Sequence, residues 1–83
     1  MVRINAGESR RVVLQNELSL VLQHIEAGAR KIAKQREMIT KLDAGGHDTT
    51  EALRKLAHCE TEQAINIARH RQITKELGPG STS

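Results

Sequence analysis

The chain has 83 residues, a formal net charge of +3 and no Phe, Trp or Tyr. A domain of this length buries a modest share of its chain surface and usually needs a disulfide, a metal or a partner chain. Its single cysteine, Cys59, excludes a disulfide within one chain. Strands favour aromatic residues, and disordered chains lack regularly spaced aliphatic ones, so the composition favours an all-α fold.

Residues 1–7 are expected to form a lead-in to the first helix. They lack the apolar core of a signal peptide. The chain also has no stretch of about 18 apolar residues, the length needed to cross a membrane. We therefore expect a cytoplasmic protein without membrane contact. Asn5 or Ser9 is a candidate cap for the helix that follows.

Residues 8–43 are predicted to form one long helix. Its apolar residues advance in alternating steps of four and three, which is the heptad pattern of a helix packed along one stripe. Gly28 and Gln35 interrupt the stripe. Its apolar members are Leu14, Leu18, Val21, Ile25, Ile32, Ile39 and Leu42.

Residues 44–47 are predicted to be a turn, because Gly45 and Gly46 suit the left-handed backbone at the end of a helix. Asp48 and Glu51 have the spacing of a capping box, so a second helix is predicted over 48–77. A polar, flexible tail is expected at 78–83. The residues expected near one face of the second helix are Leu53, Leu56, Cys59, Gln63, Ile67, His70, Ile73 and Leu77.

A short connection between two long helices makes them antiparallel neighbours. Folding the chain at Gly45 predicts five apolar pairs and places Gly28 opposite Gln63, where a small residue leaves room for a longer one. The same register predicts that Arg30 and Lys31 face Glu60 and Glu62, and that Glu17 lies near Lys75. The predicted apolar pairs are Ile39 with Leu53, Ile32 with Cys59, Ile25 with Ile67, Leu18 with Ile73, and Leu14 with Leu77.

One hairpin leaves apolar residues outside the stripe that its helices share, and a two-helix contact barely offsets the entropy of ordering the chain. Self-association is therefore expected, most simply as two hairpins in an antiparallel four-helix bundle or a coiled-coil assembly. A homodimer is the simplest partner arrangement. The surface could instead bind an amphipathic helix of another protein.

Few residues suggest chemistry. No nucleophile lies in a recognisable pattern with a base, and no glycine-rich phosphate loop is present, so we expect no enzyme and no cofactor. Zinc-ligand spacings are also absent, so no metal site is assigned, although the candidates for metal binding are His24, His47, His58, Cys59 and His70. His70 is expected beside Val21, where its charge could make assembly sensitive to pH.

Basic residues support an alternative function. Arg30, Lys31 and Lys34 lie close together in the first helix, and Arg69 and Arg71 lie near the end of the second. Such clusters can follow the phosphates of DNA or RNA. Interleaved acidic residues and the lack of aromatic residues for base stacking favour a solvated, ion-paired surface instead.

Three segments carry a resemblance to known sequences: HIEAGARKIAKQREMITKL, GHDTTEALRKL and ARHRQITKEL. Together they resemble a group of small hypothetical proteins of α-proteobacteria over about two thirds of the chain, and the GHDT turn is their most distinctive part. The resemblance implies a helical hairpin without a known activity. It singles out Gln35, Arg36 and the turn residues Gly46, His47, Asp48 and Thr49 for testing.

These patterns predict a non-catalytic assembly or regulatory adaptor that acts as a homo-oligomeric helical bundle. The alternatives are a basic bundle that binds DNA or RNA, and a bundle that responds to a metal or to pH.

Overall fold

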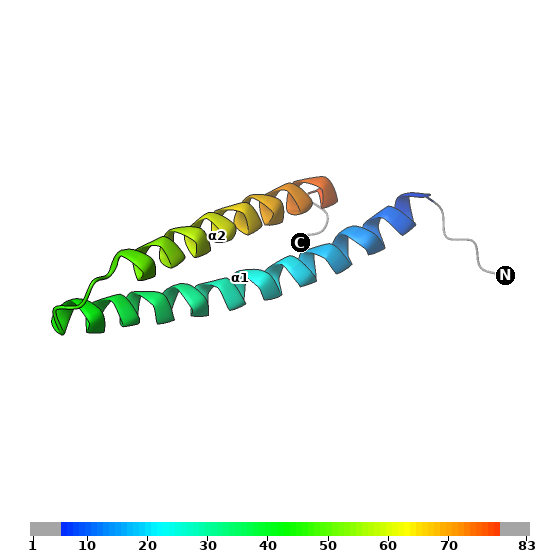
Figure 1. Ribbon diagram of the computed structural model, residues 1–83. Helices are drawn as coiled ribbons and strands as arrows, with labels where there is room; N and C mark the ends of the chain where they lie inside the picture. Colours follow the sequence, from blue (N-terminus) through cyan, green and yellow to red (C-terminus); the bar gives the residue numbers. More distant parts are fainter. Residues whose placement is uncertain (1–5, 79–83) are drawn as a thin grey trace.

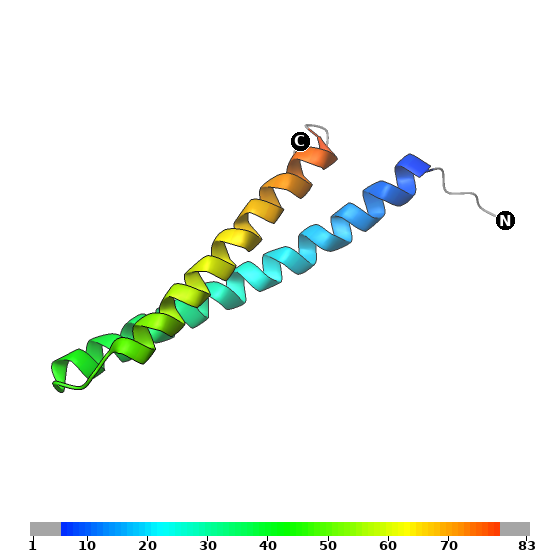
Figure 2. The ribbon, with the colours of Figure 1, turned by 45° about the horizontal axis from the view of Figure 1, so that its top comes forward.

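The computed structural model of the chain describes residues 6–78. Within that range it has two helices, α1 (Ala6–Ala44) and α2 (Thr50–Leu77), and no strand. The helices run antiparallel, side by side, in a rod with extents of 66 × 25 × 18 Å (Figure 1), and Figure 2 shows the same two helices from a second direction. The predicted helical hairpin is confirmed. Neither helix is long and apolar enough to cross a membrane.

The helix boundaries differ from the expected ones by a few residues. α1 begins at Ala6, so Ser9 lies inside its first turn rather than at its cap, while Asn5 falls outside the described residues. α2 ends at Leu77, where Gly78 closes the helix with a positive φ of 79°. The rest of the expected tail, 79–83, lies outside the described residues.

The reversal after α1 is built from hydrogen bonds of the Schellman type. The amide of His47 donates to the carbonyl of Leu42 at 2.9 Å, and the amide of Gly46 donates to that of Asp43 at 3.1 Å. Gly46 has φ 73°, the left-handed conformation that this motif requires. A Cβ at Gly45 would lie 2.8 Å from Cδ2 of His47, so a side chain there would require the exposed imidazole to move.

The start of α2 is not the capping box that the sequence predicted. Oδ1 of Asp48 accepts hydrogen bonds from the amide of Thr50 at 3.0 Å and from its hydroxyl at 2.7 Å. Glu51 lies 4.0 Å from Arg54, in the direction away from Asp48. Asp48 therefore supports the first turn through a local turn motif, and the helix begins two residues later than expected.

The two helices meet along one continuous seam. In α1 every position of the predicted stripe is buried or half-buried, Gly28 and Gln35 included, and outside the stripe only Glu17 and Ala27 among residues 8–44 are half-buried. In α2 the corresponding positions follow strict steps of four and three. They are Ala52, Leu56, Cys59, Gln63, Asn66, His70, Ile73 and Leu77.

Two predicted seam residues are therefore misplaced. Leu53 is 49% exposed and Ile67 is 38% exposed, whereas Ala52 is 6% exposed and Asn66 is half-buried. Each apolar residue lies one position after the seam residue and hence about 100° around the helix. The uninterrupted heptad decides the contact, even though alanine and asparagine are less hydrophobic than their neighbours.

The apolar core lies at the open end of the hairpin, away from the turn. Leu14, Val21, Ile73 and Leu77 are buried there, and Leu18 and Ile25 pack against them. Toward the turn, the α1 residues Ile32 and Ile39 and the α2 residue Leu56 are only half-buried. Packing of two helices alone thus encloses a small core in one half of the rod.

Candidate interaction surfaces

The middle of the seam is polar and depends on one close approach. Nε2 of Gln63 donates a hydrogen bond of 2.9 Å to the backbone carbonyl of Ile25, across the hairpin. The amide lies against Gly28, where any Cβ would collide with Oε1 of Gln63. The expected Gly28–Gln63 pairing is present, and it ties α2 to α1 at one register.

Two amide oxygens in this seam lack a partner. Oε1 of Gln63 and Oε1 of Gln35 are both buried without a hydrogen bond. An unpaired buried oxygen costs stability, about 1–3 kcal/mol for a typical group. These seam residues therefore align the two helices at some cost in folding stability. The hairpin depends on other contacts to offset that cost.

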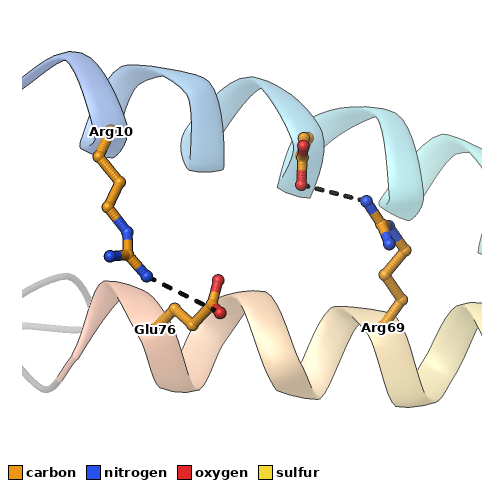
Figure 3. A network of polar contacts seen from close by, with 4 residues as sticks. Arg10, Arg69 and Glu76 are labelled. Carbon is orange, nitrogen blue, oxygen red and sulfur yellow. Dashed lines mark hydrogen bonds and ion pairs between the residues drawn. The ribbon is translucent and has the colours of Figure 1, made fainter.

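One side of the seam carries ion pairs between the helices. Arg69 lies 3.3 Å from Glu17, and Arg10 lies 3.9 Å from Glu76; Figure 3 shows both pairs bridging α1 and α2. Each of these four residues directly precedes a position of the heptad repeat, so all four lie on the same side. We call this side the paired face.

The charge pairing differs from the predicted pairing. Glu17 contacts Arg69 instead of lying near Lys75, and Glu60 lies 3.5 Å from Arg36 instead of facing Arg30 or Lys31. Glu62 binds His58, one turn away on its own helix. The reason is angular: charges interact across the hairpin only when both directly precede, or both directly follow, a seam position.

The opposite side of the seam consists of the residues that directly follow seam positions. It is richer in apolar side chains than the paired face, although Glu26, Arg36, Glu60 and Arg71 are also exposed on it, and we call it the apolar face. Leu22 is 41% exposed and Ile67 is 38% exposed there, next to the seam. Only the Arg36–Glu60 ion pair crosses it among the ion pairs of the described residues. Its exposed apolar side chains are Leu22, Ala29, Ala33, Leu53, Ala57, Ala64 and Ile67.

The basic residues considered for nucleic-acid binding do not form one patch. Arg30, Lys31 and Lys34 are exposed within about one turn of α1. Arg69 is engaged with Glu17 on the paired face, and Arg71 is about 200° further around α2. The structure thus brings together three of the five predicted contacts and separates the other two.

The metal candidates are also dispersed. His24 and Cys59 line a shallow hollow beside Gly28, together with Glu62. Nε2 of His58 lies 2.8 Å from Oε1 of Glu62, and His70 is half-buried in the seam. Within residues 6–78, no three His, Cys, Asp or Glu side chains are grouped so that they could hold a metal ion.

Sequence reasoning missed two elements of these surfaces. Ala52 and Asn66 would have been found by stepping back from Leu77 in strict alternation of four and three. The division into a paired face and an apolar face follows from the same numbering, once the seam is correct.

Comparisons with protein-family models, with curated proteins and with solved structures found no match to this chain. The resemblance to the α-proteobacterial group stays a prediction.

Proposed function

We propose that this protein is a non-catalytic assembly or adaptor module that works as a homo-oligomeric helical bundle, with a dimer as its simplest form. The observation that carries this proposal is the poor apolar burial of the single hairpin. Among the residues whose side chains the structure describes, 8–78, the core cluster has four buried members, while eight large apolar side chains remain 38–61% exposed.

The dimensions of the hairpin support the same proposal. Its radius of gyration is 18.7 Å, whereas a compact domain of 83 residues has about 12 Å. A single layer of two helices has no second layer to cover its apolar surface, and stable domains are built from two or more layers. A second hairpin would supply that layer.

Light scattering coupled to size exclusion, at 50 and 300 mM salt with and without a short DNA duplex, tests the proposal. We expect a mass of twice 9.2 kDa at both salt concentrations and no DNA complex. A folded monomer of 9.2 kDa would contradict self-association. A complex that forms at 50 mM salt and dissociates at 300 mM would instead support the nucleic-acid function, because phosphate contacts weaken steeply with salt.

A further inference from the structure

We propose that the second copy docks on the apolar face, with a two-fold axis parallel to the rod. This inference rests on the proposed self-association and specifies its surface and geometry. The two hairpins stack face to face with both turns at the same end. Each α1 then packs against the α2 of its partner, so every neighbouring pair of helices in the four-helix bundle is antiparallel.

The apolar face is favoured over the paired face by the position of its apolar side chains. Leu22 and Ile67 border the seam directly, so a partner that covers them extends the existing core. On the other side, Leu20 and Ile65 are 52% and 61% exposed, but the Glu17–Arg69 pair lies between them. A partner on the paired face would have to desolvate two ion pairs between the helices, Glu17–Arg69 and Arg10–Glu76, whereas a partner on the apolar face covers one, Arg36–Glu60.

Small side chains favour a close contact on the apolar face. Ala29 and Ala33 of α1 and Ala57 and Ala64 of α2 are all exposed there. Interaxial distances of 8–10 Å depend on the side chains at the contact, and alanine permits the shorter ones. Leu22, Leu53 and Ile67 would then fill the spaces between the four helices.

The single ion pair on this face is complementary to a copy of itself. With the two-fold axis along the rod, Arg36 of each chain faces Glu60 of the other. Since Arg36 already lies 3.5 Å from Glu60 within one chain, the dimer would contain a ring of four alternating charges. A two-fold axis perpendicular to the rod would not in general place these two residues opposite each other.

The area of the face is sufficient for a stable dimer. The 28 residues of α2 extend over about 42 Å at 1.5 Å per residue. Two helices about 10 Å apart present a surface roughly 20 Å wide, so the face covers roughly 800 Å². This is the area that each partner buries in a protein–protein interface of standard size.

A matched pair of double variants tests which face is used. L22K/I67K places two charges on the apolar face, and L20K/I65K places two charges on the other side, at positions that are more exposed. We expect the first variant to weaken dimerisation at least 100-fold in sedimentation equilibrium and the second to change it less than fivefold. Circular dichroism at a concentration where both variants are monomeric checks that the helices are retained.

A mixing experiment tests the geometry. R36E and E60R should each form weak homodimers, because each brings like charges together. Mixed in equal amounts, they should form a heterodimer at least tenfold more stable than either homodimer, since each altered charge meets its opposite on the partner chain. If Arg36 and Glu60 interacted only within one chain, the mixture would show no preference for the heterodimer.

The outcomes separate this inference from the proposed function. A monomeric wild-type protein contradicts both. A wild-type dimer that withstands L22K/I67K but not L20K/I65K assigns the interface to the other face and contradicts only the inference. A dimer that depends on Leu22 and Ile67 but shows no preference in the mixing experiment overturns the parallel two-fold axis.

Discussion

Gly28 and Gln63 form the most specific contact between the helices. Glycine in the middle of a helix costs about 1 kcal/mol relative to alanine, so its presence at this seam position needs a compensating role. The amide of Gln63 occupies the space that a Cβ would take and donates to the carbonyl of Ile25. The pair exchanges local helix stability for one defined register.

We therefore expect the effect of Gly28→Ala on stability to change sign when Gln63 is also replaced. In the wild-type chain the new methyl group displaces Gln63 and breaks its hydrogen bond, for a net loss of about 1 kcal/mol. With Gln63→Ala already present, the same change should stabilise the protein by about 1 kcal/mol through helix propensity. Urea denaturation of the four proteins at one concentration gives the double-mutant cycle, and additive effects would contradict a direct contact.

The carboxylate of Asp48, just before α2, accepts two hydrogen bonds from Thr50. The hydroxyl of Thr50, and secondarily its backbone amide, donate to Oδ1 of Asp48 and lower the pKa of the carboxyl below its ordinary value of 3.8. Because the folded-state pKa is depressed, this contribution to stability is present above the unfolded pKa. It is lost as the pH falls through the folded pKa.

Thr50→Val tests this arrangement, since it removes the hydroxyl and retains the backbone amide. We expect the pKa of Asp48 to rise toward its ordinary value without reaching it. A carboxyl ¹³C NMR titration of wild-type and variant protein measures both values. An equal pKa in the two proteins would mean that the hydroxyl does not stabilise the carboxylate.

At the scale of the elements, the reversal after α1 determines whether the helices can pair at all. Gly46 adopts φ 73°, and its amide and that of His47 complete the last turn of α1. For residues with a Cβ the left-handed conformation costs about 1–2 kcal/mol, and asparagine adopts it more readily than most.

Gly46→Ala should therefore destabilise the protein by about 1–2 kcal/mol, and Gly46→Asn by clearly less. Thermal unfolding followed by circular dichroism ranks the three proteins. A control substitution away from the turn is placed at Thr61, whose hydroxyl donates to the carbonyl of Ala57 within α2. If Gly46→Ala were neutral, the turn would have an alternative backbone conformation of similar energy.

At the scale of the whole molecule, assembly is expected to add to the stability of the folded hairpin. The polar seam residues and the small core leave the hairpin dependent on a second layer. Because a second chain that binds the folded hairpin stabilises it, the stability of a homodimer depends on protein concentration.

We expect the melting temperature to fall by about 3–5 °C for each tenfold dilution, because a tenfold change in concentration is worth about 1.4 kcal/mol for a dimer of this length. Differential scanning calorimetry from 500 to 5 μM measures the slope. L22K/I67K should melt at a lower temperature with no slope. A melting temperature independent of concentration in the wild-type chain would show that the hairpin is stable by itself.

The sequence by itself determined the features that depend on local chemistry. Steps of four and three from Leu14 to Leu42 predicted the seam of α1, and Gly45 and Gly46 predicted the reversal. Because a short turn leaves only one antiparallel register, the layers of Leu14 with Leu77 and of Gly28 with Gln63 also followed from the sequence.

Only the tertiary structure decided which of two adjacent residues in α2 packs into the seam. Ala52 and Asn66 enter the seam in place of Leu53 and Ile67, because the packing of eight successive layers outweighs the hydrophobicity of any one residue. The ion pairs were decided in the same way: a charge contacts its partner only if both lie on the same side of the seam. One residue of rotation, about 100°, separates a core position from the face that we propose receives the second chain.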